Sequence, residues 1–260
     1  MTIQINLANF TNIVDPLKIA EEIFRQNPHI HIPVPIREIA KAAGIKEIFS
    51  EKDIDFEGAL LANEEKTSGV ITYKEHTDCP GRERFTIAHE LGHYLNPKHK
   101  QNFNCEAKQL SFTNHEKEKE ANLFASYILM PDKFVLKHIN STPLLDLKFI
   151  LEMAEKFSVS TEAIIHTVSR LSKIPIAFIF SIDNKVRYFS KSKNFPYLNL
   201  RPKQKMPTSI LYSENENFEK QNIIRKKAIS WPLPYSDKTL IEETVSSKGK
   251  YGITMLYYQY

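Results

Sequence analysis

Cysteine and long apolar runs are both scarce in this sequence. Its two cysteines, Cys79 and Cys105, form no Cys-x-x-Cys pair, which argues against a disulfide framework and fits a reducing compartment. No apolar stretch approaches the roughly 18 residues of a membrane-spanning helix. The first residues also lack the charged and apolar regions of a signal peptide. We therefore expect a cytoplasmic protein that does not contact a membrane.

The charge of the chain is nearly balanced, at +4 for 260 residues. A dedicated nucleic-acid binder usually shows a clustered basic face, so this charge permits such binding without arguing for it. The apolar fraction of 42% is ample for a packed core. The length suits one large domain or two.

The segment from Phe85 to Leu95 contains the pattern His-Glu-x-x-His, formed by His89, Glu90 and His93. Residues four apart share one face of a helix, so the two histidines can hold a single metal ion. Glu90 projects from the flank of that face, where it can accept a proton from a metal-bound water. The pattern also arises by chance in long chains, so its surroundings decide whether it marks a zinc site.

The rest of this predicted helix is typical of a metal-binding platform. With His89 set at 0° and roughly 100° per residue, the apolar residues cluster between about 160° and 260°, opposite the histidines. Pro80-Gly81 interrupts the chain before the helix, and Asn96-Pro97 ends it. The alternative is an ordinary amphipathic helix whose histidines are solvated.

A second predicted helix, from Glu116 to Met130, offers a third ligand, and catalytic zinc usually has three protein ligands and one water. Measured from the centre of its apolar face, Glu118 lies about 60° away, Glu120 about 100° and Glu116 about 140°. A ligand must point inward, which favours Glu118. The other two glutamates fit a charged helix start that the helix dipole favours. Asn122 lies one turn after Glu118, where it can hydrogen-bond a ligand histidine.

Taken together, the two helices resemble the ImmA/IrrE family of metallopeptidases. The resemblance rests on Arg84 to His93, on Glu118 to Ala125 and on Leu129-Met130-Pro131. It implies a zincin-like fold with a Zn²⁺ site (Mn²⁺ is the alternative metal) made by His89, His93 and Glu118, and it makes Glu90 the catalytic base. It also implies a protein substrate: a helix-turn-helix repressor whose cleavage releases stress, mobile-element or prophage genes.

A metallopeptidase also needs a hydrogen-bond donor to the oxyanion of the reacting peptide. Three residues are candidates for this donor: Tyr73, His76 and His115. The sequence does not choose among them.

The chain before the motif predicts helices from Asp15 to Phe24 and from Pro35 to Gly44. Two strands follow, Gly58 to Ala62 and Gly69 to Tyr73, and a polar turn joins them into a hairpin. In zinc peptidases of this design a strand beside the metal helix holds the substrate in extended form. Val70 to Tyr73 is our candidate for that strand, and a purely structural strand is the equal alternative.

Leu147 to Phe157 and Thr161 to Leu171 predict a pair of helices that resembles a helix-turn-helix. The strongly polar residues of the second helix are Glu162, His166 and Arg170. Helices that read DNA usually offer more Arg, Lys, Asn or Gln. We therefore do not expect direct DNA binding, and we expect the pair to pack against the peptidase core.

Predicted strands dominate the chain beyond Lys173. Ile174 to Ile182, a turn at Asp183-Asn184 and a strand from Lys185 to Ser190 predict a hairpin. Thr239 to Val245 and Tyr251 to Tyr258 predict a second pair of strands. Longer ImmA/IrrE relatives carry a C-terminal domain similar to the GAF sensor fold, so the resemblance implies an accessory or sensor role here.

The sequence thus predicts an α+β protein of three parts: a zinc metallopeptidase domain at residues 1–140, a helix-turn-helix-like segment at 141–173 and a β-rich domain at 174–260. The predicted function is that of a zinc-dependent endopeptidase. A non-proteolytic DNA-binding regulator and a toxin–antitoxin partner that acts by binding are the alternatives. Glu90 argues against the regulator, because a pure binder has no need of a catalytic base.

Overall fold

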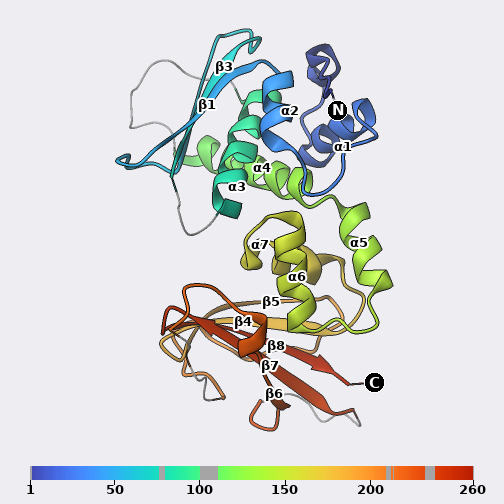
Figure 1. Ribbon diagram of the computed structural model, residues 1–260, viewed down its shortest axis with the longest axis vertical. Helices are drawn as coiled ribbons and strands as arrows, with labels where there is room; N and C mark the ends of the chain where they lie inside the picture. Colours follow the sequence, from blue (N-terminus) through green and yellow to red (C-terminus); the bar gives the residue numbers. More distant parts are fainter. Residues whose placement is uncertain are drawn as a thin grey trace. The chain divides into compact units, whose positions relative to one another are not determined.

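The computed structural model describes residues 2–75, 80–99, 111–208, 212, 214–231 and 238–259. The chain forms two compact units (Figure 1): unit 1 is Met1–Pro131 with Lys156–Ser160, and unit 2 is Asp132–Glu155 with Thr161–Tyr260. Helices combined with two separate sheets confirm the α+β class. The boundaries after residues 140 and 173 stay a prediction. Among the described residues, no helix is long and apolar enough to cross a membrane.

Unit 1 combines helices with a three-stranded sheet. Asp15 caps its first α-helix by accepting a hydrogen bond from the Lys18 N–H at 3.0 Å, as the Asp-Pro start predicts. The elements are η1 (Leu7–Phe10), α1 (Pro16–Gln26), α2 (Ile36–Ala42), β1 (Ile45–Glu51), β2 (Gly58–Ala62), β3 (Gly69–Lys74), α3 (Pro80–Leu95) and α4 (Ser111–Leu129).

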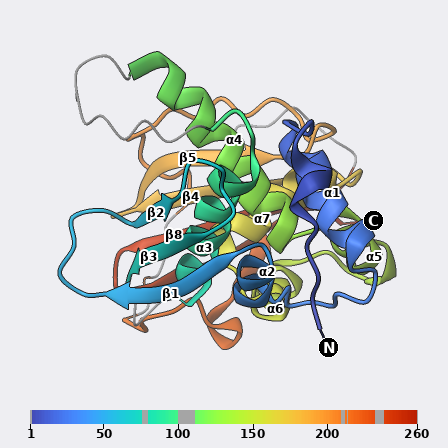
Figure 2. The same ribbon diagram turned by 90° about the horizontal axis from the view of Figure 1, so that it is seen from above.

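The strands of unit 1 are ordered β1-β3-β2, so β3 is central (Figure 2). The antiparallel pairing of β2 with β3 confirms the predicted hairpin, and β1 adds to β3 in parallel. Both sides of β3 are therefore already paired. The prediction that Val70 to Tyr73 receives the substrate is wrong for this reason, and β2 is the strand at that edge of the sheet.

Helix α3 lies at the centre of unit 1 and packs against α2, β2, β3 and α4. Its Ile87 and Leu91 are fully buried, as are Ile71 of β3 and Ile128 of α4. The apolar side of α3 thus faces the core, as its sequence pattern predicts. The opposite side is left for the histidines.

Two helix starts differ from the prediction. Helix α3 begins at Pro80 itself, because proline is well suited to the first turn of a helix, where its missing N–H has no partner to lose. Helix α4 begins at Ser111, before the predicted start at Glu116. Glu118 and Glu120 therefore lie beyond its first turn, where the helix dipole no longer explains them.

Unit 2 contains three α-helices and a five-stranded sheet in the part of it that the structure describes. Its strands are ordered β5-β4-β8-β7-β6, and all neighbours are antiparallel. The elements are α5 (Asp132–Ser141), α6 (Leu147–Phe157), α7 (Thr161–Leu171), β4 (Ile176–Ile182), β5 (Lys185–Lys191), η2 (Lys220–Asn222), β6 (Ile224–Lys227), β7 (Leu240–Ser247) and β8 (Tyr251–Tyr258).

The predicted hairpin around Asp183-Asn184 is confirmed, since β4 pairs with β5. Both turn residues have positive φ, 48° and 59°, as a tight two-residue turn between twisted strands requires. The pairing of β7 with β8 confirms the second predicted pair. The likeness of this unit to a GAF domain stays a prediction.

Helix α7 packs on the sheet of unit 2. The ring of His166 stacks on Phe180 and Tyr188, with ring centroids 5.9 and 5.8 Å away. Arg170 makes a bidentate ion pair with Asp132 of α5, at 2.6 and 2.8 Å. The sequence predicts that this helical pair packs on the peptidase core. Helix α7 instead packs within unit 2, and only the end of α6 with the residues that follow it, Lys156–Ser160, belongs to unit 1.

Candidate metal centre

Helix α3 carries His89, Glu90 and His93. The helix ends at Leu95, and the Asn96 N–H still bonds to the carbonyl of Gly92 at 3.1 Å. The Lys66 ammonium, from the turn between β2 and β3, donates to the carbonyls of His93 and Asn96 at 2.7 and 2.8 Å. A cation at the carbonyl end of a helix complements its dipole, so the sheet fixes the end of α3 that bears the second histidine.

Helix α4 crosses α3 closely because Gly92 has no side chain at the contact. A Cβ atom on Gly92 would lie 2.9 Å from a ring carbon of Phe124 and 3.3 Å from the Cα of Ala121. Such distances are shorter than ordinary van der Waals contact. This close approach brings the side chains of α4 within reach of both histidines.

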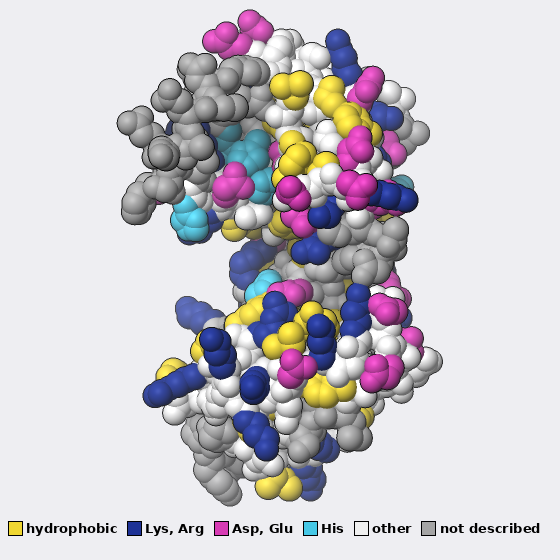
Figure 3. Space-filling view, turned by 90° about the vertical axis from the view of Figure 1, so that its left-hand side faces the viewer, with side chains coloured by type: hydrophobic (Ala, Val, Ile, Leu, Met, Phe, Trp, Pro, Cys, Tyr) yellow, Lys and Arg dark blue, Asp and Glu magenta, His cyan; other side chains and the backbone are white. Residues whose placement is uncertain are grey.

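The close crossing brings together the side chains that the sequence predicts as ligands. Glu118 Oε2 lies 3.1 Å from His89 Nε2, Glu118 Oε1 lies 3.4 Å from His93 Nε2, and the two Nε2 atoms are 3.1 Å apart. One ligand atom from each residue lies within 4.8 Å of the others. Figure 3 shows His side chains gathered beside Asp and Glu side chains on one face of unit 1. Two imidazoles and a carboxylate are a donor set typical of catalytic zinc.

Nδ1 of His89, the ring nitrogen that does not face Glu118, has a hydrogen-bond partner of its own. His89 Nδ1 lies 2.9 Å from Asn122 Oδ1, the position that the sequence predicts for Asn122. An amide oxygen can only accept, so Nδ1 carries the proton and the Nε2 lone pair faces the cluster.

The outer ring nitrogen of His93 has a partner that the sequence does not indicate. His93 Nδ1 lies 3.0 Å from Nδ1 of His99, and His99 Nε2 lies 2.8 Å from Glu120 Oε2. Glu120 therefore bonds a buried histidine, and reading it as a charged helix start is wrong. Neither His99 nor Glu120 belongs to a recognisable motif, and their spacing in the sequence gives no signal of the contact.

Burial favours the neutral forms of His93 and His99. Burial, and to a lesser extent the charges of His89 and His99, lower the pKa of His93 to about 3. Burial also lowers the pKa of His99, against the opposing effect of Glu120. A neutral histidine is the form that binds a metal.

Glu90 is buried beside the cluster, with 8% of its surface exposed. Burial, and next the carboxylate of Glu118, raise its pKa from 4.5 to about 7. A Cβ atom on Gly58 of β2 would lie 2.9 Å from Glu90 Oε1, so the glutamate lies directly against the edge strand. A carboxyl group whose pKa is near 7 can both accept and return a proton at neutral pH.

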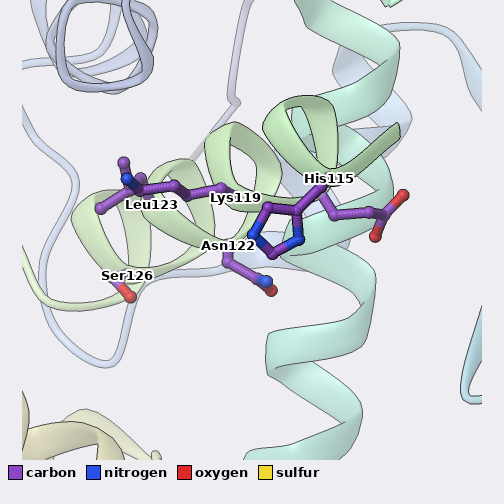
Figure 4. A pocket seen from close by; sticks show the side chains of 6 residues that line it. His115, Lys119, Asn122, Leu123 and Ser126 are labelled. Atoms are coloured by element: carbon purple, nitrogen blue, oxygen red, sulfur yellow. The ribbon is translucent and has the colours of Figure 1, made fainter. Parts of the chain in front are cut away.

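A hollow of ≈ 360 Å³ opens on α4 beside Glu118 (Figure 4). Its lining is His115, Glu118, Lys119, Asn122, Leu123 and Ser126. His115, a candidate oxyanion donor, is thus next to the ligands. Tyr73 is buried and its hydroxyl accepts a hydrogen bond from Arg37. His76 and both cysteines lie outside the described residues.

Comparison with known proteins identifies the family to which these features belong. The model of the peptidase M78 family, described as the IrrE N-terminal-like domain, matches residues 40–169. A comparison with curated proteins gives no match. A solved structure, that of a Mycobacterium tuberculosis transcriptional regulator, aligns with 96% of this chain and 90% of its own, at 16% identity and a TM-score of 0.51. That likeness establishes a shared fold.

Proposed function

Because this chain belongs to the peptidase M78 family of IrrE N-terminal-like domains, we propose that it is a zinc-dependent endopeptidase. The observation that carries the proposal is the convergence of His89 Nε2, His93 Nε2 and the Glu118 carboxylate beside the buried Glu90. These residues would hold the ion and leave a position for water, and manganese is the alternative metal. When bound, zinc supplies a Lewis acid and lowers the pKa of a coordinated water toward about 7.

The chain's own residues provide the proton transfers. Glu90 accepts the proton of the attacking water and passes it to the amine that leaves. His115 lies beside the ligands in the hollow, so it is the candidate donor to the oxyanion that the geometry favours. Tyr73 is a weaker candidate because its hydroxyl already bonds to Arg37 within the fold.

The substrate would lie extended along β2. This strand forms the edge of its sheet, and Gly58 at its start adjoins Glu90. Main-chain pairing with an edge strand holds a peptide extended without demanding a particular sequence. This arrangement replaces the predicted role of β3.

The protein partner in this proposal is a helix-turn-helix repressor in the cytoplasm, and unit 2 serves selection of the substrate or control. The alternative, a non-proteolytic DNA-binding regulator, would use α7 to read DNA. Two of the polar residues of α7 have partners inside unit 2: His166 is stacked on aromatic rings, and Arg170 is paired with Asp132. This supports the peptidase over the regulator.

The test is incubation of the purified protein and zinc with helix-turn-helix repressors encoded by the neighbouring genes, followed by mass spectrometry of the products. We expect cleavage that chelation abolishes and that Glu90→Gln lacks. Intact repressor after incubation with zinc-loaded protein would refute the peptidase. Sequence-specific binding of the protein to promoter DNA, with full derepression by Glu90→Gln, would establish the regulator instead.

A further inference from the structure

His99 follows the end of α3 and lies between two other titratable side chains. One ring nitrogen is 3.0 Å from His93 Nδ1, and the other is 2.8 Å from Glu120 Oε2. The His99 side chain is 2% exposed. A continuous chain of hydrogen bonds therefore runs from Glu120 on α4, through His99, to His93 on α3.

The Glu120 carboxylate fixes which atom donates and which accepts in each hydrogen bond of this chain. An ionised carboxylate has no proton to donate, so His99 must donate from Nε2 to Glu120. A neutral His99 then has a lone pair on Nδ1 and accepts the proton on His93 Nδ1. The lone pair of His93 is thereby placed on Nε2, which is the nitrogen 3.4 Å from Glu118.

The two ligand histidines differ in how their tautomers are set. Asn122 orients His89 through its amide oxygen, which can only accept. His93 is bonded to a second histidine, which can either donate or accept, so this contact alone leaves its tautomer open. Glu120 removes the ambiguity.

Glu120 is itself held in place by the end of α3. Asn96 Nδ2 lies 3.2 Å from Glu120 Oε2 and 3.1 Å from the carbonyl oxygen of Val14, to both of which it donates. The carboxylate that directs the chain is thus fixed to the helix that carries the ligands.

We propose that His99 and Glu120 are positioning residues that set the tautomer of His93 and thereby the affinity of the site for its metal. The inference rests on the proposed metal site and deepens it. Partners of this kind, bonded to a ligand histidine, typically contribute about 10–100-fold in metal affinity.

The test compares His99→Phe, which fills the space without hydrogen bonds, with His99→Gln, which can accept from His93 and donate to Glu120. Zinc affinity is measured by competition with a chromophoric chelator. We expect about a 10–100-fold loss for His99→Phe and recovery of most of it in His99→Gln. Glu120→Ala should lose affinity like His99→Phe, and Glu120→Gln should retain more. Glu116→Gln, at an exposed position of α4 outside the chain of hydrogen bonds, is the control and should bind zinc as wild type does.

Nitrogen-15 NMR of the imidazoles in the metal-free protein gives a second readout. We expect protonated Nδ1 on His93 in wild type and a mixture of tautomers in His99→Phe. Wild-type affinity and an unchanged His93 tautomer in His99→Phe would overturn the inference. A wild-type protein that binds no zinc would refute the proposed metal site instead, and the tautomer of His93 would still test the chain. If His99→Phe does not fold, Glu120→Ala and Glu120→Gln carry the same comparison.

Discussion

Adding a single methyl group at Gly58 should impair Glu90 while leaving the metal ligands in place. A Cβ atom there would lie 2.3 Å from Thr86 Cγ2 and 2.9 Å from Glu90 Oε1. Carbon atoms pack at about 3.5–4.0 Å, so Thr86 Cγ2 and the strand must move apart by more than about 1 Å, and Glu90 Oε1 must give way by a smaller distance. A misplacement of about 1 Å can cost about 10²-fold in rate. Overpacking of this kind costs about 1–3 kcal/mol of stability.

We therefore expect Gly58→Ala to cleave the repressor more slowly, by at most about 10²-fold, while its zinc affinity stays close to that of wild type. The assays are initial cleavage rates, chelator competition and thermal unfolding. In Gly58→Ala/Thr86→Ser the contact with Thr86 Cγ2 is gone but the contact with Glu90 remains. Stability should recover in the double variant and the rate should not.

Gly69→Ala is the matched control, since its Cβ would press on Ile45 and Leu61 of the same sheet at 3.0 and 3.2 Å and on the Tyr94 ring at 3.3 Å, but not on Glu90. It should lower stability without slowing cleavage by the folded protein. A Gly58→Ala variant that cleaves at the wild-type rate would refute the placement of Glu90 against β2.

Three further predictions concern the site and its partner. Glu118→Ala should lose zinc on elemental analysis, because it removes the one carboxylate of the cluster; full occupancy in that variant, with loss in Glu120→Ala, would mean that the ligand was misassigned. Glu90→Gln should keep zinc and fold but lose about 10²–10⁴-fold in cleavage, since an amide accepts no proton; an unchanged rate would remove Glu90 from the mechanism. In gel-shift assays at physiological salt the protein should form no stable complex with promoter DNA, because α7 offers one arginine and no lysine for phosphates.

The parts of the site that the sequence predicts are those that local periodicity fixes. His89 and His93 share a helical face because they are four residues apart, and the angular position of Glu118 follows from the apolar residues of its own helix. The hairpin of β2 and β3 follows likewise from two short apolar runs and a polar turn. Each of these features depends on residues close in sequence, and the structure has each of them.

The parts that the sequence does not predict depend on pairings between distant segments. Whether β3 is an edge strand is decided by β1, which pairs with it in parallel from residues more than twenty positions away. His99 meets Glu120 across 21 positions and only because Gly92 lets α4 approach α3. Neither residue has a periodic pattern that would reveal the contact.

The buried Glu90 should also make the stability of the metal-free protein depend on pH. Its pKa is raised from 4.5 to about 7, mainly by burial, so between these values the folded state retains a proton that the unfolded state has released. The free energy of unfolding should therefore fall as pH rises from 4.5 to 7, by at most about 3 kcal/mol from this group.

His93 affects the free energy of unfolding in the opposite direction. Its folded pKa of about 3 lies below 6.5, so its stabilising contribution is lost as pH falls. Burial lowers the pKa of His99 and of His166 as well, so these two histidines act in the same direction as His93. Denaturant unfolding of chelator-treated wild type and Glu90→Gln from pH 4.5 to 8 isolates the effect of Glu90, because the variant retains the contributions of the histidines and lacks that of Glu90. Wild type should lose stability relative to Glu90→Gln as pH rises, and parallel curves would show that Glu90 titrates at its ordinary pKa.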